Sequence, residues 1–160
     1  MFSRKKANPR DTPLSPDELL LRMENFCAYR ERCPKEVRTK LLELGAAAEL
    51  AREIFDSLKA DKFFDETRFA TAYASGKFRN NQWGKVRIRL ELRMRDIAPG
   101  IIQEALALID QEEYEKVLLK LLQKKLLQYE GDDKSREKSA ASLIRAGYEP
   151  ELVFKYLNKL

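Results

Sequence analysis

A repeat of 51 residues constrains the fold of this chain more than any other feature of its sequence. Apolar residues recur at this spacing with no insertion, in four sets: Leu41, Leu92 and Leu143; Leu50, Ile101 and Leu152; Phe55, Leu106 and Leu157; Leu58, Ile109 and Leu160. Self-similarity at a long fixed period is typical of stacked repeats, in which each unit buries its apolar face against a neighbour. The sequence therefore predicts three tandem units in an elongated, curved array.

Each unit is predicted to hold three helices. Pro34, Pro99 and Pro150 suit the first turn of a helix, where the missing N–H is harmless. Gly45 and Gly147 suit the left-handed position that ends a helix. The helix that opens each unit is expected over 17–30, 65–79 and 111–129. The expected fold class is all-α, built from three three-helix, helix-turn-helix-like repeats with about nine helices and no strand.

The chain is predicted to consist of an arm followed by these repeats. The boundaries are 1–16 for a flexible N-terminal arm, 17–63 for repeat 1, 64–113 for repeat 2 and 114–160 for repeat 3. The arm is slightly basic and lacks the apolar stretch of a signal peptide. No apolar run approaches the length of a membrane span. We therefore expect a cytoplasmic monomer, in which Cys27 and Cys33 are in a reducing compartment.

Basic residues concentrate in the middle of repeat 2. The whole chain has a net charge of +5. Between residues 76 and 95 only Glu91 opposes seven basic residues: Lys77, Arg79, Lys85, Arg87, Arg89, Arg93 and Arg95. Such a concentration is typical of a surface that meets a phosphate backbone or an acidic protein groove. These seven residues are the predicted site for a protein or nucleic-acid partner.

The helix expected from about residue 84 to 95 would present this charge. Three cations at i, i+4 and i+8 form one stripe: Lys85, Arg89 and Arg93. Apolar residues lie on both sides of the stripe: Ile88 and Leu92 on one, Val86, Leu90 and Met94 on the other. We therefore expect two apolar faces that pack between neighbouring units and leave the basic stripe at the surface.

Other interpretations of this segment stay open. A charge run on a helix is often only a solvated face, and arginine stems also cover apolar surface. Trp83, Phe78 and Tyr73 are close to the cations in sequence, and aromatic residues among arginines can stack on bases. We expect instead that Tyr73 and Phe69 lie in the core and that Trp83 packs at the turn.

The sequence offers no support for catalysis. It contains no histidine, which is the commonest general base and metal ligand. The two cysteines have no zinc-site spacing, and Cys27 is expected to be a small core residue. Neither a phosphate-binding glycine loop nor a serine elbow is present. We predict a binding protein that needs no cofactor and no metal.

The second unit resembles the RecX family of recombinase regulators. The segment 65–70, Asp-Glu-Thr-Arg-Phe-Ala, followed by Tyr73, looks like the opening of that family's middle unit. The segment 84–97 continues the resemblance with a Gly, an Arg-Ile pair, a Glu-Leu-Arg triplet and a closing Ile. Asp96 stands where the family usually has Gly, and because Asp tolerates left-handed geometry we expect the turn to be kept. In the first unit six residues also fit: Ala28, Glu31, Glu36, Lys40, Leu41 and Gly45.

This resemblance covers about residues 20–157 and implies a function. RecX-like proteins consist of three tandem three-helix repeats, have no enzymatic activity and act on RecA. They are thought to lie in the groove of the RecA–DNA filament, where they restrain its ATPase, its strand exchange and its co-protease action on LexA. The resemblance thus implies RecA and the RecA–single-stranded DNA filament as partners. Weak direct DNA binding is a separate expectation from the basic residues, and whether they contact RecA, DNA or both stays open. The alternatives are a helix-turn-helix-like DNA- or RNA-binding protein and a scaffold with no nucleic-acid role.

Overall fold

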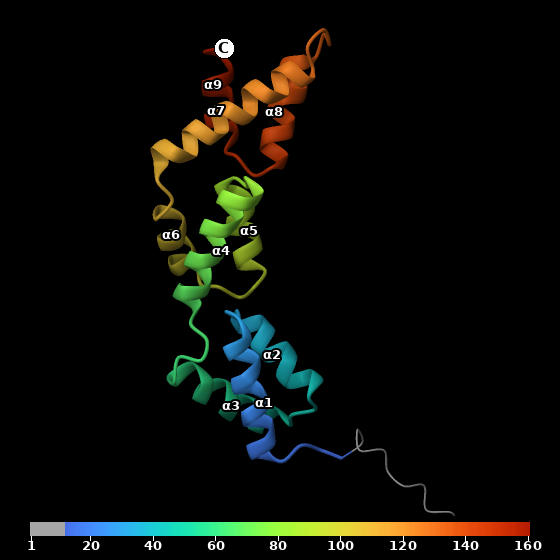
Figure 1. Cartoon of the computed structure of the whole chain (residues 1–160), viewed down its shortest axis with the longest axis vertical. Coiled ribbons are helices and arrows are strands. Elements are labelled where there is room, and N and C mark those ends of the chain that lie inside the picture. Colours follow the sequence, from blue (N-terminus) through green and yellow to red (C-terminus); the bar gives the residue numbers. More distant parts are fainter. Residues whose placement is uncertain (1–11) are drawn as a thin grey trace, which may run out of the picture. The chain divides into compact units, whose positions relative to one another are not determined.

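The computed structural model describes residues 12–160, which fold entirely into helices and their connections (Figure 1). The helices follow in this order: α1 (Pro16–Tyr29), α2 (Pro34–Glu43), α3 (Ala48–Ala60), α4 (Glu66–Asn81), α5 (Lys85–Arg93), α6 (Pro99–Ala107), α7 (Gln111–Gln128), α8 (Ser135–Arg145) and α9 (Pro150–Leu157). The all-α prediction is confirmed. Most of the predicted arm, residues 1–11, lies outside the described residues. Within the described part, no helix is both long and apolar enough to cross a membrane.

The helices pack in triples, as the 51-residue period requires. α1 to α3 pack on one another, and so do α4 to α6 and α7 to α9. We call these triples the first, second and third repeat. By compactness the chain divides into two units, one ending at Asp65 and one covering Glu66–Leu160, and each is described by itself.

The same backbone hydrogen bond closes the second helix of every repeat. The N–H groups of Ala46, Ile97 and Tyr148 each donate to the carbonyl of the leucine five residues earlier, over 3.1 to 3.2 Å. This bond forms when the preceding residue takes the left-handed conformation. Gly45, Asp96 and Gly147 do so, with φ of 76°, 62° and 102°. The turn predicted at Asp96 is therefore kept, and it ends α5 at Arg93 rather than Arg95.

The first unit has its own apolar core. Five of its large buried side chains come from all three helices and the segment after them: Leu19, Met23, Leu41, Leu58 and Phe64. Cys27 is buried among them, as predicted, and this burial raises the pKa of its thiol. Ser15 caps the N-terminal end of α1: its Oγ accepts a hydrogen bond from the Glu18 N–H at 3.2 Å, and the Glu18 carboxylate accepts one from the Ser15 N–H.

The second unit joins the second and third repeats through a common aromatic core. The ring of Tyr114 lies 5.6 Å from that of Phe78 and 5.2 Å from that of Tyr148, measured between centroids. Backbone hydrogen bonds cross the same junction, from the Gly84 N–H to the Ala146 carbonyl at 2.9 Å and from the Val86 N–H to the Gly147 carbonyl at 2.9 Å. The N-terminal end of α5 is thus fixed to the loop between α8 and α9.

Candidate binding surface of the second repeat

The structure distributes the seven predicted site residues over different surroundings. Lys77 and Arg79 lie on α4, four cations lie on α5, and Arg95 follows α5. A single basic face would require all seven to be exposed on one side of the repeat. Instead, some of them cover aromatic rings, one bonds to the third repeat, and only part of the set projects beside a groove.

Three of the cations surround a pair of aromatic rings. Tyr73 and Trp83 pack edge to face, with centroids 6.5 Å apart. The guanidinium carbon of Arg87 lies 3.9 Å from the Trp83 centroid, and Lys77 Nζ lies 4.9 Å from it. The guanidinium carbon of Arg95 lies 4.8 Å from the Tyr73 centroid. Cations so placed are attracted by the ring quadrupole. This arrangement supports the interpretation that Trp83 packs at the turn over a base-stacking role.

Arg95 is also tied to its own helix. Its Nη1 donates to the Glu91 carboxylate and to the Glu91 carbonyl oxygen, both over 2.8 Å. Both side chains are about one-third exposed, at 31% and 28%. An ion pair with this exposure adds little stability, but it orients the side chain along the end of α5. Arg95 therefore has a structural role in the turn after α5.

Lys85 belongs to the junction with the third repeat. Its Nζ donates to Gln111 Oε1 over 2.8 Å and lies 4.7 Å from the Tyr114 ring centroid. The Lys85 N–H also donates to the Tyr114 hydroxyl, which in turn donates to Glu149 over 2.8 Å. Burial, as the main cause, raises the pKa of the Tyr114 phenol. The predicted stripe of Lys85, Arg89 and Arg93 is therefore divided, because its first member is engaged by α7.

The other two members of the stripe, Arg89 and Arg93, are exposed beside a groove. This groove, of about 480 Å³, lies between α5 and α6 and is completed by Pro99, Ile102 and Gln103. Among residues 12–160, neither guanidinium forms an ion pair or lies over an aromatic ring. Two neighbouring arginines of this kind keep their N–H groups for carboxylate or phosphate oxygens. They are the members of the predicted set best placed to contact a partner.

The prediction of two buried apolar faces on α5 is wrong. Ile88 and Leu92 are fully buried against α4 and α6, but Leu90 is 55% and Met94 61% exposed. The reason is that the third repeat contacts the N-terminal end of α5, at Gly84 and the residues after it, and does not cover its side. The exposed side of α5 therefore presents Leu90 and Met94 next to the two arginines, a combination that charge patterning alone did not reveal.

Arg79 lies apart from this surface. It lines a smaller hollow of about 230 Å³ together with Asp110 and Glu113, near the junction of α6 and α7. Two carboxylates so close make this hollow unsuited to phosphate. In the part of the chain that the structure describes, no group of side chains has the composition of a metal site.

Comparison with known proteins gives a consistent result. Residues 65–106 match the family model described as RecX, second three-helix domain. The chain is 29% identical over 132 residues to "Regulatory protein RecX" of Bacillus licheniformis, covering 81% of this chain and 50% of that protein. It is 26% identical over 144 residues to the protein of the same name from Prosthecochloris aestuarii, covering 88% and 92%. The chain thus spans about half the length of the Bacillus relative and most of the Prosthecochloris one.

Solved structures agree in fold. The crystal structure of RecX from Lactobacillus salivarius has a TM-score of 0.83 at 22% identity, covering 91% of this chain and 96% of that one. Another, titled "Crystal structure of regulatory protein RecX", has a TM-score of 0.82 at 20% identity. The family model covers the second repeat, and the sequence relatives extend the match over most of the chain. Taken together, these matches identify residues 65–106 as similar to the second three-helix domain of RecX, and most of the chain as similar in sequence and in fold to RecX proteins.

Proposed function

We propose that this chain is a non-enzymatic regulator that binds RecA on single-stranded DNA and inhibits its ATPase, strand-exchange and co-protease activities. By doing so it would modulate DNA repair and the SOS response. The proposal is supported by the relatives named regulatory protein RecX. We further propose that it acts in the cytoplasm as a monomer and needs no cofactor.

The observation that carries the proposed contact is the exposed side of α5. It combines two arginines, Arg89 and Arg93, with two large apolar side chains, Leu90 and Met94. A surface that binds only phosphate gains nothing from exposed apolar side chains, whereas a protein interface uses them together with arginine. This composition favours an acidic and partly apolar surface of RecA as the main contact, with DNA phosphate as a secondary one.

Inhibition follows from binding across neighbouring RecA protomers. A ligand shifts a conformational equilibrium only if it binds one state better than another. A regulator that contacts two RecA protomers at once stabilises the relative position of the protomers that matches the distance between its own contact surfaces. It disfavours the other relative positions. The ATP cycle of the filament requires those protomers to change their relative position, so it is slowed. The regulator itself catalyses no reaction.

The proposal is tested with RecA from the same organism on single-stranded DNA. We expect ATP turnover to fall as the protein is added at or below the RecA concentration, and the protein alone to hydrolyse no ATP. Unchanged turnover, filament length and strand exchange would reject the regulator. Tight, strongly salt-dependent binding to bare DNA together with unaffected RecA would instead establish the nucleic-acid-binding alternative.

A further inference from the structure

Two cations of the second repeat meet over one indole ring. Lys77 Nζ lies 4.9 Å and the guanidinium carbon of Arg87 lies 3.9 Å from the Trp83 centroid. Both distances end at the same centroid, so these two atoms are no further apart than the sum of the distances. Among residues 12–160, neither cation forms an ion pair or a side-chain hydrogen bond. We call Lys77, Trp83 and Arg87 the indole cluster.

The first repeat shows what balances a cation on a ring at the same place. A shift of 51 residues gives three pairs: Phe26 and Lys77, Arg32 and Trp83, Glu36 and Arg87. In the first repeat the guanidinium carbon of Arg32 lies 3.7 Å from the Phe26 centroid, and its Nη1 lies 3.7 Å from the Glu36 carboxylate. An arginine stacked on a ring therefore still meets an acid with its N–H edge. The second repeat has a second cation, Arg87, where the first has this acid.

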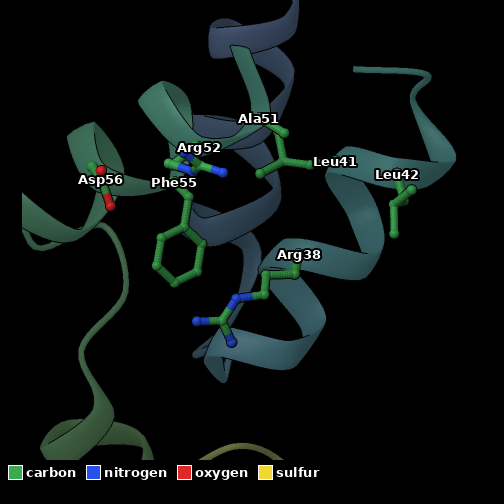
Figure 2. Close-up of a pocket in the computed structure, with 7 residues that line it drawn as sticks. All are labelled: Arg38, Leu41, Leu42, Ala51, Arg52, Phe55 and Asp56. Carbon is green, nitrogen blue, oxygen red and sulfur yellow. The ribbon is translucent and has the colours of Figure 1, made fainter. Parts of the chain in front are cut away.

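Another stacked arginine of the first repeat also has an acid in its surroundings. The guanidinium carbon of Arg38 lies 4.5 Å from the Phe55 centroid, and Figure 2 shows it reaching toward that ring. Asp56 lines the same groove, which lies between α2 and α3. The indole cluster differs, because the only acid between residues 76 and 95, Glu91, is bonded to Arg95 over 2.8 Å.

The connection between α4 and α5 holds the indole cluster in place. Gln82 takes the left-handed conformation, with φ of 56°. The Trp83 N–H donates to the Lys77 carbonyl over 3.2 Å, and the Tyr148 hydroxyl donates to the Gln82 carbonyl over 3.0 Å. Arg87 is exposed, while Lys77 and Trp83 are half-buried. A ligand therefore meets cations that are already positioned, which lowers the entropic cost of binding.

The composition of the cluster favours a phosphate group as the missing anion. Two cations that share a ring repel each other, and the ring quadrupole offsets only part of this repulsion. A phosphate has oxygens on several sides, so it can accept from an ammonium and a guanidinium at once. Arg87 covers the indole of Trp83, so the bound group is the phosphate and not a stacked base.

We propose that the indole cluster binds a backbone phosphate of single-stranded DNA. Lys77 and Arg87 would donate to its oxygens, while Trp83 holds the two cations together. Residues two apart on a helix, such as Arg87 and Arg89, face different directions, so this phosphate contact is separate from the contact at Arg89 and Arg93. That the strand is the one in a RecA filament rests on the proposed function, whereas the phosphate site does not.

The test is a titration of the ¹⁵N-labelled full chain with oligothymidylate in NMR, without RecA. We expect chemical shift changes concentrated in the indole cluster, including the single indole N–H resonance of the chain. An abasic deoxyribose-phosphate oligomer of the same length should bind within about twofold, because phosphate contacts do not read bases. Absence of shifts in the cluster at millimolar oligothymidylate, or an abasic oligomer that fails to bind, would overturn the proposal.

Two further probes separate the possible sources of the anion. One is a glutamate peptide with the same charge as the oligothymidylate, and the other is inorganic phosphate. Both should bind the cluster more weakly than oligothymidylate. A peptide that binds equally well would identify an acidic protein as the occupant, and inorganic phosphate that binds equally well would identify the free ion. Either result contradicts the proposal.

Variants measure the part of each cation through the anisotropy of a labelled oligothymidylate. Lys77→Gln and Arg87→Gln should each weaken binding at least about threefold and reduce the slope of log affinity against log salt by about 0.7. The matched control, Lys120→Gln with Lys124→Gln, removes two exposed cations from α7 and should bind within about twofold of the unmodified chain. Equal losses in the cluster variants and the control would show that net charge, and not this site, controls binding.

Arg87→Glu gives the second repeat the acid that the first repeat has at Glu36. The new carboxylate should pair with Lys77 and take the place of the phosphate, so oligothymidylate binding should fall at least about tenfold. Arg87 is exposed, so the fold should be retained, which circular dichroism checks. A folded variant that binds oligothymidylate as well as the unmodified chain would refute the phosphate site. None of these measurements contains RecA, so they are independent of the proposed regulation.

Discussion

The backbones of Gly84 and Gly147 lie so close together that a Cβ atom on Gly84 would be 2.2 Å from the carbonyl carbon of Gly147. The constraint is reciprocal, because a Cβ on Gly147 would lie 2.3 Å from the Cβ of Arg87. Non-bonded carbon atoms do not approach so closely. The position of the third repeat against the second therefore depends on the absence of both side chains.

Gly84→Ala is expected to lower the free energy of unfolding by about 1–3 kcal/mol, because the new methyl group meets backbone that has to move. Gly76→Ala is the matched control. Gly76 lies inside α4, where an added Cβ meets nothing within 4 Å. There alanine should raise stability by about 0.5–1 kcal/mol through its higher helix propensity. Urea denaturation followed by circular dichroism measures both, and equal effects would contradict the packing argument.

Reversal of the two exposed arginines tests the proposed contact. The pair Arg89→Glu with Arg93→Glu should weaken inhibition of the RecA ATPase at least about tenfold, since favourable contacts are replaced by repulsion. Lys85 is left unchanged because it bonds to Gln111 and its loss would disturb the junction.

The control for this reversal makes the same change of charge elsewhere. Lys120→Glu with Lys124→Glu alters two exposed cations with the same spacing on α7, and it should leave inhibition near that of the unmodified chain. Inhibition constants from ATP turnover compare the two pairs. If both pairs lose inhibition equally, net charge rather than this surface controls binding.

Arg95 provides a contrasting prediction. Arg95→Ala removes the ion pair to Glu91 and the contact with the Tyr73 ring, so we expect a loss of about 1 kcal/mol in stability. Inhibition of RecA should be unchanged at a temperature where the variant is fully folded. Thermal denaturation and ATP turnover measure the two effects separately. A variant of normal stability that no longer inhibits RecA would show that Arg95 is part of the contact surface.

Stability should fall in alkaline solution. The folded protein holds the pKa of Tyr114 above its ordinary value of 10.0, chiefly because the phenol is buried. Above that pH the unfolded chain releases the phenolic proton while the folded chain retains it. Unfolding is therefore favoured as pH rises, and below that pH the effect is absent. Burial likewise raises the pKa of Tyr148, which adds to the slope.

The variant Tyr114→Phe tests this alkaline dependence. It should flatten the fall of melting temperature with pH above about 10 without abolishing it, because Tyr148 still contributes. At neutral pH it should cost about 1 kcal/mol, through loss of the hydrogen bonds to Lys85 N–H and Glu149. Melting temperatures measured across this range would contradict the assignment if the slope were the same in both proteins.

Much of the fold was predictable because the signals that carry it are local. Pro34, Gly45 and Gly147 begin or end helices through backbone geometry that does not depend on distant residues. The 51-residue register predicted three-helix repeats because apolar positions at a fixed period must face equivalent neighbours. The repeat boundaries and the elongated, curved arrangement stay predictions.

The site was less predictable because it depends on contacts between segments distant in sequence. No pattern in α5 indicates that Lys85 bonds to Gln111, 26 residues later, or that Arg87 lies over Trp83 while Arg89 projects beside a groove. Leu90 and Met94 have the spacing of a buried face, yet both are exposed, and the third repeat bonds to α5 only near its N-terminal end, at Gly84 and Val86. Charge counting located the segment, and tertiary packing decided which cations are available.

The position of Trp83 has a practical consequence. It is the only tryptophan of the chain, and it lies beneath Arg87 in the repeat that carries the proposed contact surface. Its intrinsic fluorescence therefore originates at one known place. RecA binding that displaces Arg87 would change the emission of this indole. The unlabelled protein thus contains an optical reporter of binding at the second repeat.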